Sequence, residues 1–472
     1  MRFVLATLLC LWGATAWADK KPDKKKAAPE EKGYHFVLTI HNSPDTVMYL
    51  GNYYVGKTYA IDTARRNKKG QFVFESKDVK LLPGLYFFSN PKGSYVEFMV
   101  YHEKPDFVFE TDHPQWAEHI KVKGSKENEL FYFYNGQKRR MTDLLDSVKK
   151  EGNDSVYKAV YRKCQDELVD IINAHPDNML SVMINALREP EVPIHDSTGR
   201  KLSDRERYMY FIEHYFDHVA LDNDVLVRTP EVFFYKKVMD YLDKNLKGAS
   251  AEFIIEYVDK MIEKSRPSKE VFKYLVHTIT EKYLQTNIMS YDAIYVHMVK
   301  KYYATGDNFW SSPSVIDEQV KRANTWERLL IGKQAPELIL KDTEGRPRSM
   351  YQLPNKYTLL VFWSPTCGHC KVVIPELYAK YQEYKDKYDI AAFAILSEPD
   401  EPTRPKWHKF IKDHQLDWIN LDGGEANIDW HEVYDVITTP QIYLLDKDKK
   451  ILAKKLNAES FEMVIKALEG VE

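Results

Sequence analysis

Residues 361–370 read Val-Phe-Trp-Ser-Pro-Thr-Cys-Gly-His-Cys, an apolar run that leads through a short polar turn into two cysteines. The apolar residues predict a buried strand over 358–363, and the pattern that follows predicts a helix over 367–388. Cys367 is then expected at the helix N-terminus, where free backbone N–H groups and the helix dipole stabilise a thiolate. Because the thiolate is the nucleophilic form of cysteine, this sulfur is suited to attack on a disulfide.

The spacing of the two cysteines gives the second one a role. With two residues between them, the Cys370 sulfur can reach Cys367 and resolve a mixed disulfide formed there. A zinc site is the alternative use of such a pair, but the sequence has no second Cys-x-x-Cys or Cys-x-x-His pair to complete four ligands. We therefore expect neither a metal nor another cofactor.

Strand and helix patterns alternate from Ile331 to the end of the sequence. Parallel strands joined by crossover helices form an α/β domain, which we expect over 331–472. Further strands are predicted over 390–396, 441–445 and 451–455, and further helices over 402–414 and 460–468.

This C-terminal region resembles the thioredoxin superfamily, and within it the exported TlpA/ResA-like thiol–disulfide oxidoreductases. The resemblance covers under a third of the chain. It rests on Trp363 four residues before the first cysteine, Pro375 five residues after the second, Thr439-Pro440 before a strand, and the opening Gly332-Lys333-Gln334-Ala335-Pro336. It implies a thioredoxin fold in which Cys367 is the attacking cysteine and Cys370 the resolving one.

The resemblance also implies a substrate-binding surface formed by Trp363, His369, Thr439 and Pro440. Pro440 is expected in cis, so that the backbone of Thr439 lies beside the sulfurs and pairs with an extended substrate. A Thr-Pro dipeptide can also be an ordinary loop, but its position directly before a buried strand favours the functional interpretation.

One position departs from the family pattern. Many thioredoxins carry a buried Asp where this chain has Val361, so the usual proton acceptor for Cys370 is missing. TlpA-like proteins often place a Glu after the next strand, and Glu398 follows the strand predicted over 390–396. We expect Glu398 to accept the proton of the resolving thiol. The alternative is a solvated loop acid.

His369 bears on the direction of electron flow. Protein disulfide isomerases also carry Gly-His between their cysteines, and their potential is about −180 mV against about −270 mV for thioredoxin. The TlpA/ResA resemblance favours a reductase, whereas Gly368-His369 favours an oxidase or isomerase. Both directions stay open at this point.

The N-terminus has the pattern of a signal peptide over 1–18, with an apolar stretch from Phe3 to Ala16 and a cleavage site at Ala16-Trp17-Ala18. Lipidation of Cys10 is an alternative that we set aside, because no small residues precede it. A Lys-, Glu- and Pro-rich linker is expected over 19–32. The pattern predicts a periplasmic protein, and no later apolar run reaches the roughly 20 residues that span a bilayer.

Two further domains are expected between the linker and the α/β region. Over 33–125, alternation with a period of two and Gly/Pro turns predict an antiparallel, β-sandwich-like domain. Over 126–330 the period is helical, with helix starts at Ser203 and Thr229-Pro230, and an all-α domain is predicted. Both regions resemble domains fused to exported thioredoxin-like proteins of Bacteroidetes-type bacteria.

Three side chains outside the motif are further functional candidates. Cys164 falls on an apolar helical face and is expected to be buried rather than redox-active. His214 and His218 have a spacing that can hold a metal, but no third ligand is visible in the sequence. The formal net charge of −3 gives no reason to expect nucleic acid as a partner.

Two classes of function fit these observations. The leading one is an exported enzyme that exchanges disulfides with envelope proteins, with a membrane electron donor as a second candidate partner. The alternative is an envelope binding or scaffold protein, in which residues 33–330 bind a partner and the Cys-x-x-Cys motif is incidental. The intact Trp363, Pro375 and Thr439-Pro440 argue against a decayed site and favour the enzyme.

Overall fold

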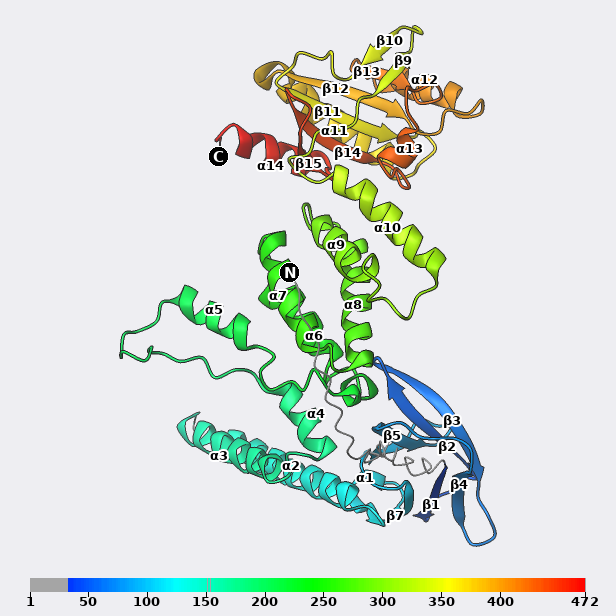
Figure 1. Ribbon diagram of the computed structural model, residues 1–472, viewed down its shortest axis with the longest axis vertical. Coiled ribbons are helices and arrows are strands. Elements are labelled where there is room, and N and C mark those ends of the chain that lie inside the picture. Colours follow the sequence, from blue (N-terminus) through cyan, green and yellow to red (C-terminus); the bar gives the residue numbers. More distant parts are fainter. Residues whose placement is uncertain (1–32, 151, 153, 472) are drawn as a thin grey trace, which may run out of the picture.

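The structure is a computed structural model that describes residues 33–150, 152 and 154–471. The predicted signal peptide and linker, at 1–18 and 19–32, lie outside these residues. A strand-rich domain, a helical domain and an α/β domain follow one another along the long axis of the molecule (Figure 1). Within the described ranges, no helix is long and apolar enough to cross a membrane.

Two four-stranded sheets build the N-terminal domain, with strand orders β4-β1-β7-β8 and β3-β2-β5-β6. Its elements are β1 (Tyr34–His41), β2 (Val47–Tyr54), β3 (Lys57–Arg65), β4 (Gln71–Ser76), β5 (Gly84–Ser89), β6 (Tyr95–Val100), β7 (Asp106–Asp112), α1 (Trp116–His119) and β8 (Lys121–Lys123). One pairing departs from the antiparallel prediction, because β7 returns to the first sheet and runs parallel to β1. Alternating residues of both sheets, including Phe36, Phe98 and Phe109, share one core.

The middle domain is helical, as predicted. Its helices are α2 (Lys126–Lys150), α3 (Asp154–Asn173), α4 (Met179–Leu187), α5 (Asp204–His214), α6 (Tyr235–Asp240), α7 (Ala251–Lys264), α8 (Lys269–Leu284), α9 (Asp292–Met298) and α10 (Pro313–Arg328). The cap predicted at Ser203 is present, as a capping box with Glu206. The helix predicted from Thr229-Pro230 begins only at Tyr235, because the Thr229 hydroxyl bonds back to the Leu226 carbonyl instead of capping a new helix.

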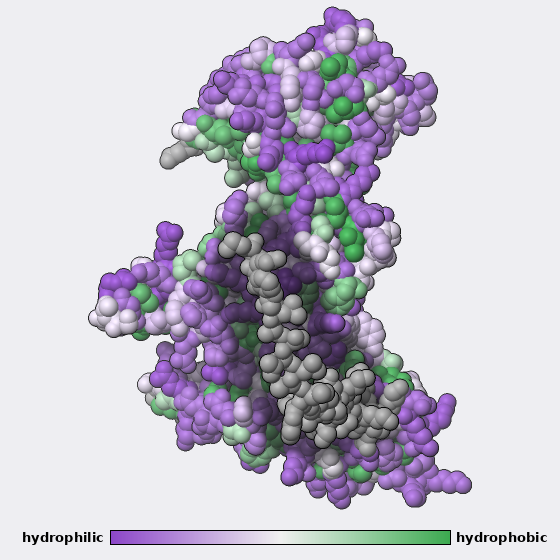
Figure 2. All heavy atoms as spheres, viewed as in Figure 1, coloured by the Kyte–Doolittle hydropathy of each residue, from purple (hydrophilic) through white to green (hydrophobic). Residues whose placement is uncertain are grey.

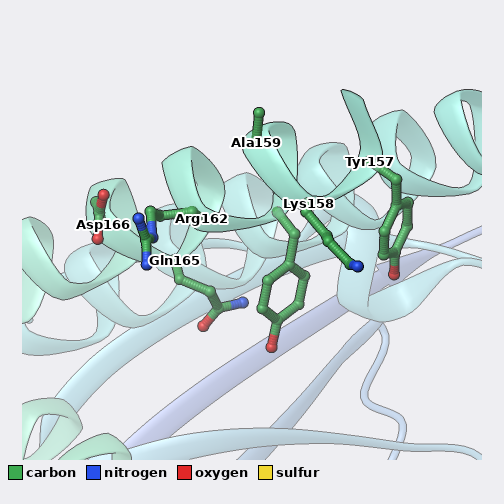
Figure 3. Close-up of a pocket in the computed structure, with 7 residues that line it drawn as sticks. Tyr157, Lys158, Ala159, Arg162, Gln165 and Asp166 are labelled. Carbon is green, nitrogen blue, oxygen red and sulfur yellow. The ribbon is translucent and has the colours of Figure 1, made fainter. Parts of the chain in front are cut away.

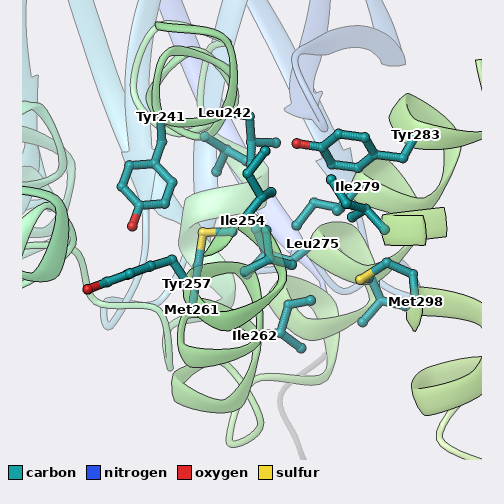
Figure 4. Packing of buried hydrophobic residues seen from close by; sticks show 14 of the residues in the cluster. Tyr241, Leu242, Ile254, Tyr257, Met261, Ile262, Leu275, Ile279, Tyr283 and Met298 are labelled. Carbon is teal, nitrogen blue, oxygen red and sulfur yellow. The ribbon is translucent and has the colours of Figure 1, made fainter. Parts of the chain in front are cut away.

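Aromatic and aliphatic side chains at helical spacing form the core of this domain. Ile254 and Met261 of α7 face Leu275 and Ile279 of α8 (Figure 4). The hairpin of β2 and β3 joins the first domain to this one, since the Tyr54 hydroxyl donates to Glu270 Oε2 at 2.8 Å.

A seven-stranded mixed sheet, with order β10-β9-β13-β12-β11-β14-β15, forms the C-terminal domain. Its elements are β9 (Ile339–Asp342), β10 (Pro347–Ser349), β11 (Tyr357–Trp363), α11 (Cys370–Tyr388), β12 (Ile390–Leu396), α12 (Arg404–Asp413), β13 (Ile419–Asp422), α13 (Trp430–Val433), β14 (Gln441–Asp446), β15 (Ile451–Lys454) and α14 (Ala458–Leu468). The central strand β11 runs parallel to β12 and antiparallel to β14.

Helices cover both faces of β11, and every residue of this strand is buried. Val361 and Trp363 belong to the apolar cluster that includes α11 and α14, and Phe362 belongs to the cluster on the other face with Trp430. Val361 therefore places a hydrocarbon side chain in the core where many thioredoxins have a carboxylate.

Candidate redox site

The two cysteines stand at the start of α11, directly after β11. The helix begins at Cys370 rather than at the predicted Cys367, and Cys367 lies in the turn before it. The backbone N–H of Cys367 donates to the Ser364 carbonyl at 3.3 Å, which closes this turn. Cys367 is half-buried, whereas Cys370 is fully buried in the core below α11.

The two thiols have opposite electrostatic environments. Partial burial opposes ionisation of Cys367 and by itself would raise the pKa of this thiol. Hydrogen bonds from the backbone N–H groups of Cys370 and His369, and from the Thr439 side chain, have the larger effect. The pKa of Cys367 is therefore lowered. Burial dominates at Cys370 and raises the pKa of its thiol to about 11. Cys367 is therefore the thiol that ionises first.

The loop before β14 lies beside the first sulfur. In the pairing of β11 with β14, Gln441 stands opposite Phe362, and the two residues before Gln441 therefore reach the turn after β11. The Thr439–Pro440 peptide bond is cis, as the resemblance implied. Cys367 Sγ lies 3.2 Å from the Thr439 carbonyl oxygen.

Of the expected substrate-binding residues, the structure brings His369, Thr439 and Pro440 together around Cys367, and it corrects the expectation for Trp363. The Trp363 side chain has no exposed surface and packs against Phe410 in the core. A residue in the middle of a sheet that is covered on both faces cannot touch a substrate, so Trp363 supports the motif from within.

Glu398 lies in the loop after β12, next to the motif. Its Oε2 atom accepts hydrogen bonds from the Ser364 hydroxyl, at 2.7 Å, and from the Thr366 hydroxyl. These hydroxyl groups favour the ionised carboxylate and lower the pKa of Glu398. Ser364 is fully buried, and its backbone contacts the Cys370 thiol. The carboxylate thus reaches the neighbourhood of Cys370 through Ser364.

Sequence reasoning missed Ser364 and Thr366, although both stand in the quoted motif and carry hydroxyl groups. It also missed a cavity of about 730 Å³ between the helical and α/β domains, which His369 and Pro440 line. A hollow of about 670 Å³ runs along α3, between Tyr157 and Asp166, and contains no part of the redox site (Figure 3).

The remaining candidates are accounted for in the helical domain. Cys164 is buried on α3, as predicted. His214 pairs with Asp217, with Nδ1 and Oδ2 2.5 Å apart, and the described part of the chain contains no group of His, Cys, Asp or Glu that could hold a metal ion.

Three families match successive parts of the chain. Residues 331–454 match the AhpC/TSA family, residues 34–131 match the domain of unknown function DUF4369, and residues 153–329 match the domain of unknown function DUF5106. The C-terminal domain is thus similar to the thioredoxin-like domains of the AhpC/TSA family.

Relatives of this domain include named redox proteins. The thiol–disulfide oxidoreductase ResA of a Bacillus cereus strain is 28% identical over 139 residues, which are 29% of this chain and 76% of that protein. ResA of Bacillus subtilis is 25% identical over 127 residues, 27% of this chain and 67% of the relative. The resemblance to ResA-like proteins is thereby confirmed for the C-terminal domain.

Solved structures are also similar. A thioredoxin-like protein from Bacteroides caccae is 22% identical, with a TM-score of 0.49 over 59% of this chain and 97% of that one. A domain of a possible thiol-disulfide isomerase from Cytophaga hutchinsonii is 34% identical, with a TM-score of 0.28 over 30% of this chain and 94% of that one.

Proposed function

We propose that the protein is a thiol–disulfide oxidoreductase in which Cys367 attacks a substrate disulfide and Cys370 resolves the product. The observation that carries this proposal is the contrast between the two thiols. Cys367 is accessible and its pKa is lowered, whereas Cys370 is buried and its pKa is raised to about 11. A nucleophile must be an exposed thiolate, and a resolving cysteine must wait as a thiol until the mixed disulfide forms.

In the reducing direction the reaction balances as follows. The Cys367 thiolate attacks one sulfur of the substrate disulfide, and the other substrate sulfur leaves as a thiolate. Cys370 then loses its proton and attacks the Cys367 sulfur, which releases the second substrate thiolate and forms the Cys367–Cys370 disulfide. Two electrons pass from the cysteine pair to the substrate, and the reverse sequence oxidises a dithiol.

Glu398 is proposed to assist the second step. Cys370 must lose a proton there, although burial favours its neutral form. The Glu398 carboxylate, whose pKa is lowered, accepts a hydrogen bond from the Ser364 hydroxyl, and the backbone of the same serine contacts the Cys370 thiol. A carboxylate held in this position would stabilise the proton that Cys370 releases.

The proposed setting is the periplasm, with envelope proteins as substrates. The support for this setting is the signal-peptide pattern over 1–18. Because ResA-like proteins are the relatives of the catalytic domain, we favour the reducing direction, with a membrane electron donor to restore the dithiol. Gly368-His369 keeps the oxidising direction as the alternative.

Trapping the substrate tests the proposal. A Cys370→Ser variant cannot resolve its mixed disulfide, so it should retain cysteine-containing envelope proteins through a bond that dithiothreitol cleaves. The matched control is Cys367→Ser, which lacks the attacking sulfur and should retain nothing. If the wild-type cysteine pair neither reduces nor oxidises a disulfide, the scaffold interpretation replaces the enzyme.

A further inference from the structure

The cavity between the helical and α/β domains adjoins the redox site and has a wall from each domain. The α/β wall includes His369 and Pro440. The helical wall includes the end of α8 and the connection that follows it, at residues 284–287, and Trp326 of α10. The cavity is therefore incomplete without the helical domain. Figure 2 shows the narrow waist of the molecule where the two domains meet.

Specific polar contacts hold the two walls together. The Trp326 indole N–H donates to Asp435 Oδ2 at 2.6 Å, across the domain boundary. Lys454 of β15 forms a buried ion pair with Asp292 of α9, and its ammonium group also donates to the Leu329 carbonyl at 2.6 Å. With such contacts on both sides, the cavity is a built feature of the fold rather than a loose gap between domains.

The lining of the cavity suits a stretch of polypeptide. Ile437, in the loop before Pro440, is 67% exposed, and Trp326 and Leu456 add further apolar surface. Asp292 Oδ1 is buried and accepts no hydrogen bond from the protein. Polar and charged side chains, among them Arg322, Asp435 and Lys455, line the rest of the cavity. It therefore offers partners for the polar backbone of a peptide as well as an apolar surface for one of its side chains, and its volume is that of an ordinary ligand site.

The position of the sulfur determines which part of a substrate reaches this cavity. Cys367 Sγ lies beside the Thr439 carbonyl, and the next residue, Pro440, lines the cavity. A polypeptide whose cysteine is bonded to Cys367 and which lies along Thr439 and Pro440 must carry its neighbouring residues into the space between the domains. A small disulfide reacts with the Cys367 sulfur without any neighbouring residues, so it leaves the cavity empty.

We propose that this cavity binds the segment of a protein substrate that flanks the reacting cysteine, with a large apolar side chain of that segment against Ile437 and Trp326. The helical domain thereby selects polypeptide disulfides over small ones. This inference rests on the proposed function of the cysteine pair and names the substrate class for it.

Single-turnover kinetics of the reduced, full-length protein test the inference. The probes are two short peptides in which one cysteine carries a nitrothiobenzoate group, with either tryptophan or glycine two residues from the cysteine. The symmetrical dithiobis(nitrobenzoate) serves as the small disulfide. In each case Cys367 forms a disulfide with the remaining part and coloured nitrothiobenzoate leaves, so one signal reports every reaction.

The wild-type protein should react faster with the tryptophan peptide than with the glycine peptide. Ile437→Glu should lower the rate ratio of tryptophan peptide to small disulfide about tenfold, the value expected for loss of one apolar contact of about 1.4 kcal/mol. Val372→Glu is the matched control, because Val372 is 57% exposed on α11 near the motif and does not line the cavity. It should leave the ratio unchanged.

A second pair of variants examines the helical wall. Asn287→Trp should fill the cavity from the helical side and lower the same ratio, whereas Ile288→Trp changes the next residue, which is outside the lining, and should not. Equal ratios for cavity and control variants, or equal rates for both peptides, would overturn the inference. Failure of the wild-type protein to release nitrothiobenzoate from any probe would instead overturn the proposed function.

Discussion

Cys367 Sγ and the carbonyl oxygen of Thr439 are 3.2 Å apart, although 72 positions separate the two residues in the sequence. The antiparallel pairing of β11 with β14 produces this contact, because β11 ends where β14 begins, at the same edge of the sheet. The reacting sulfur is therefore flanked by helix N–H groups on one side and by the loop before β14 on the other. In this setting the pKa of the Cys367 thiol is lowered.

Alkylation by iodoacetamide should distinguish the two thiols by their pH dependence. The rate follows the thiolate, which increases about tenfold per pH unit below the pKa and levels off above it. Because the pKa of Cys367 is lowered, its rate should level off below the pH at which an ordinary cysteine does so. Cys370, with a pKa of about 11, should stay unreactive at neutral pH. Mass spectrometry of the modified residue checks this, and preferential labelling of Cys370 would reverse the two roles.

Replacement of Glu398 by Gln should slow release of a mixed disulfide more than its formation, because only release requires Cys370 to lose its proton. Ser364→Ala removes a hydroxyl that holds the Glu398 carboxylate in place, and it should produce the same pattern. Glu401→Gln is the control, since this acid of the same loop has a 93% exposed side chain. Rapid mixing with a disulfide substrate resolves both steps. Equal effects on both steps would identify Glu398 as a structural acceptor for Ser364 and Thr366.

The features close to the motif could be predicted from the sequence for a physical reason. A buried strand, a helix start and a Thr-Pro loop are each encoded within a few neighbouring residues, and the order of elements around Cys367 follows from them. The prediction that Trp363 touches substrate was wrong because it followed the family resemblance, whereas the burial that the apolar pattern predicts for the strand extends to its last residue. The role of Ser364 and Thr366 depends on Glu398, more than thirty residues away, and only the fold brings them together.

The domain interface was the least predictable part. Lys454 ends a strand and Asp292 begins a helix, and in sequence both are ordinary positions for surface charges. The structure buries them together, 162 positions apart. Short strands such as β9 and β13, with four residues each, were also missed, because such runs carry little periodicity.

Replacement of His369 by Pro should lower the reduction potential of the cysteine pair. His369 is exposed beside Cys367, and its backbone N–H contributes to the lowered pKa of that thiol. Proline has no such N–H, so the reduced form loses stabilisation, and a shift of about 30 mV corresponds to about 1.4 kcal/mol for this two-electron couple. Equilibration with glutathione buffers measures it. An unchanged or raised potential would remove Gly368-His369 as support for an oxidising role.

The ion pair between Lys454 and Asp292 should be costly to break from one side. Lys454→Met leaves a buried carboxylate without its partner and should destabilise the protein by about 3–5 kcal/mol. The double variant with Asp292→Leu should recover most of this loss, since an apolar pair of similar volume avoids the desolvation of both charges.

Urea unfolding followed by circular dichroism measures these changes. The control is Lys409→Met, which breaks an exposed pair with Asp413 and should cost less than about 1 kcal/mol. A Lys454→Met variant as stable as the wild type would mean that this pair does not hold the domains together.

The fragment 331–472 should fold and retain the chemistry while losing the selectivity. It contains every strand of the seven-stranded sheet and both cysteines. Its losses are confined to the interface, where Trp326 no longer reaches Asp435 and Lys454 loses Asp292. Once the helical domain is removed, water reaches Lys454, so the fragment does not retain a buried unpaired charge.

Fragment and full-length protein should therefore release nitrothiobenzoate from the small disulfide at similar rates, and only the full-length protein should prefer the tryptophan peptide. A folded fragment that reacts with neither probe would show that the upstream domains help to build the redox site itself, and the boundary between chemistry and recognition at Ile331 would then be wrong.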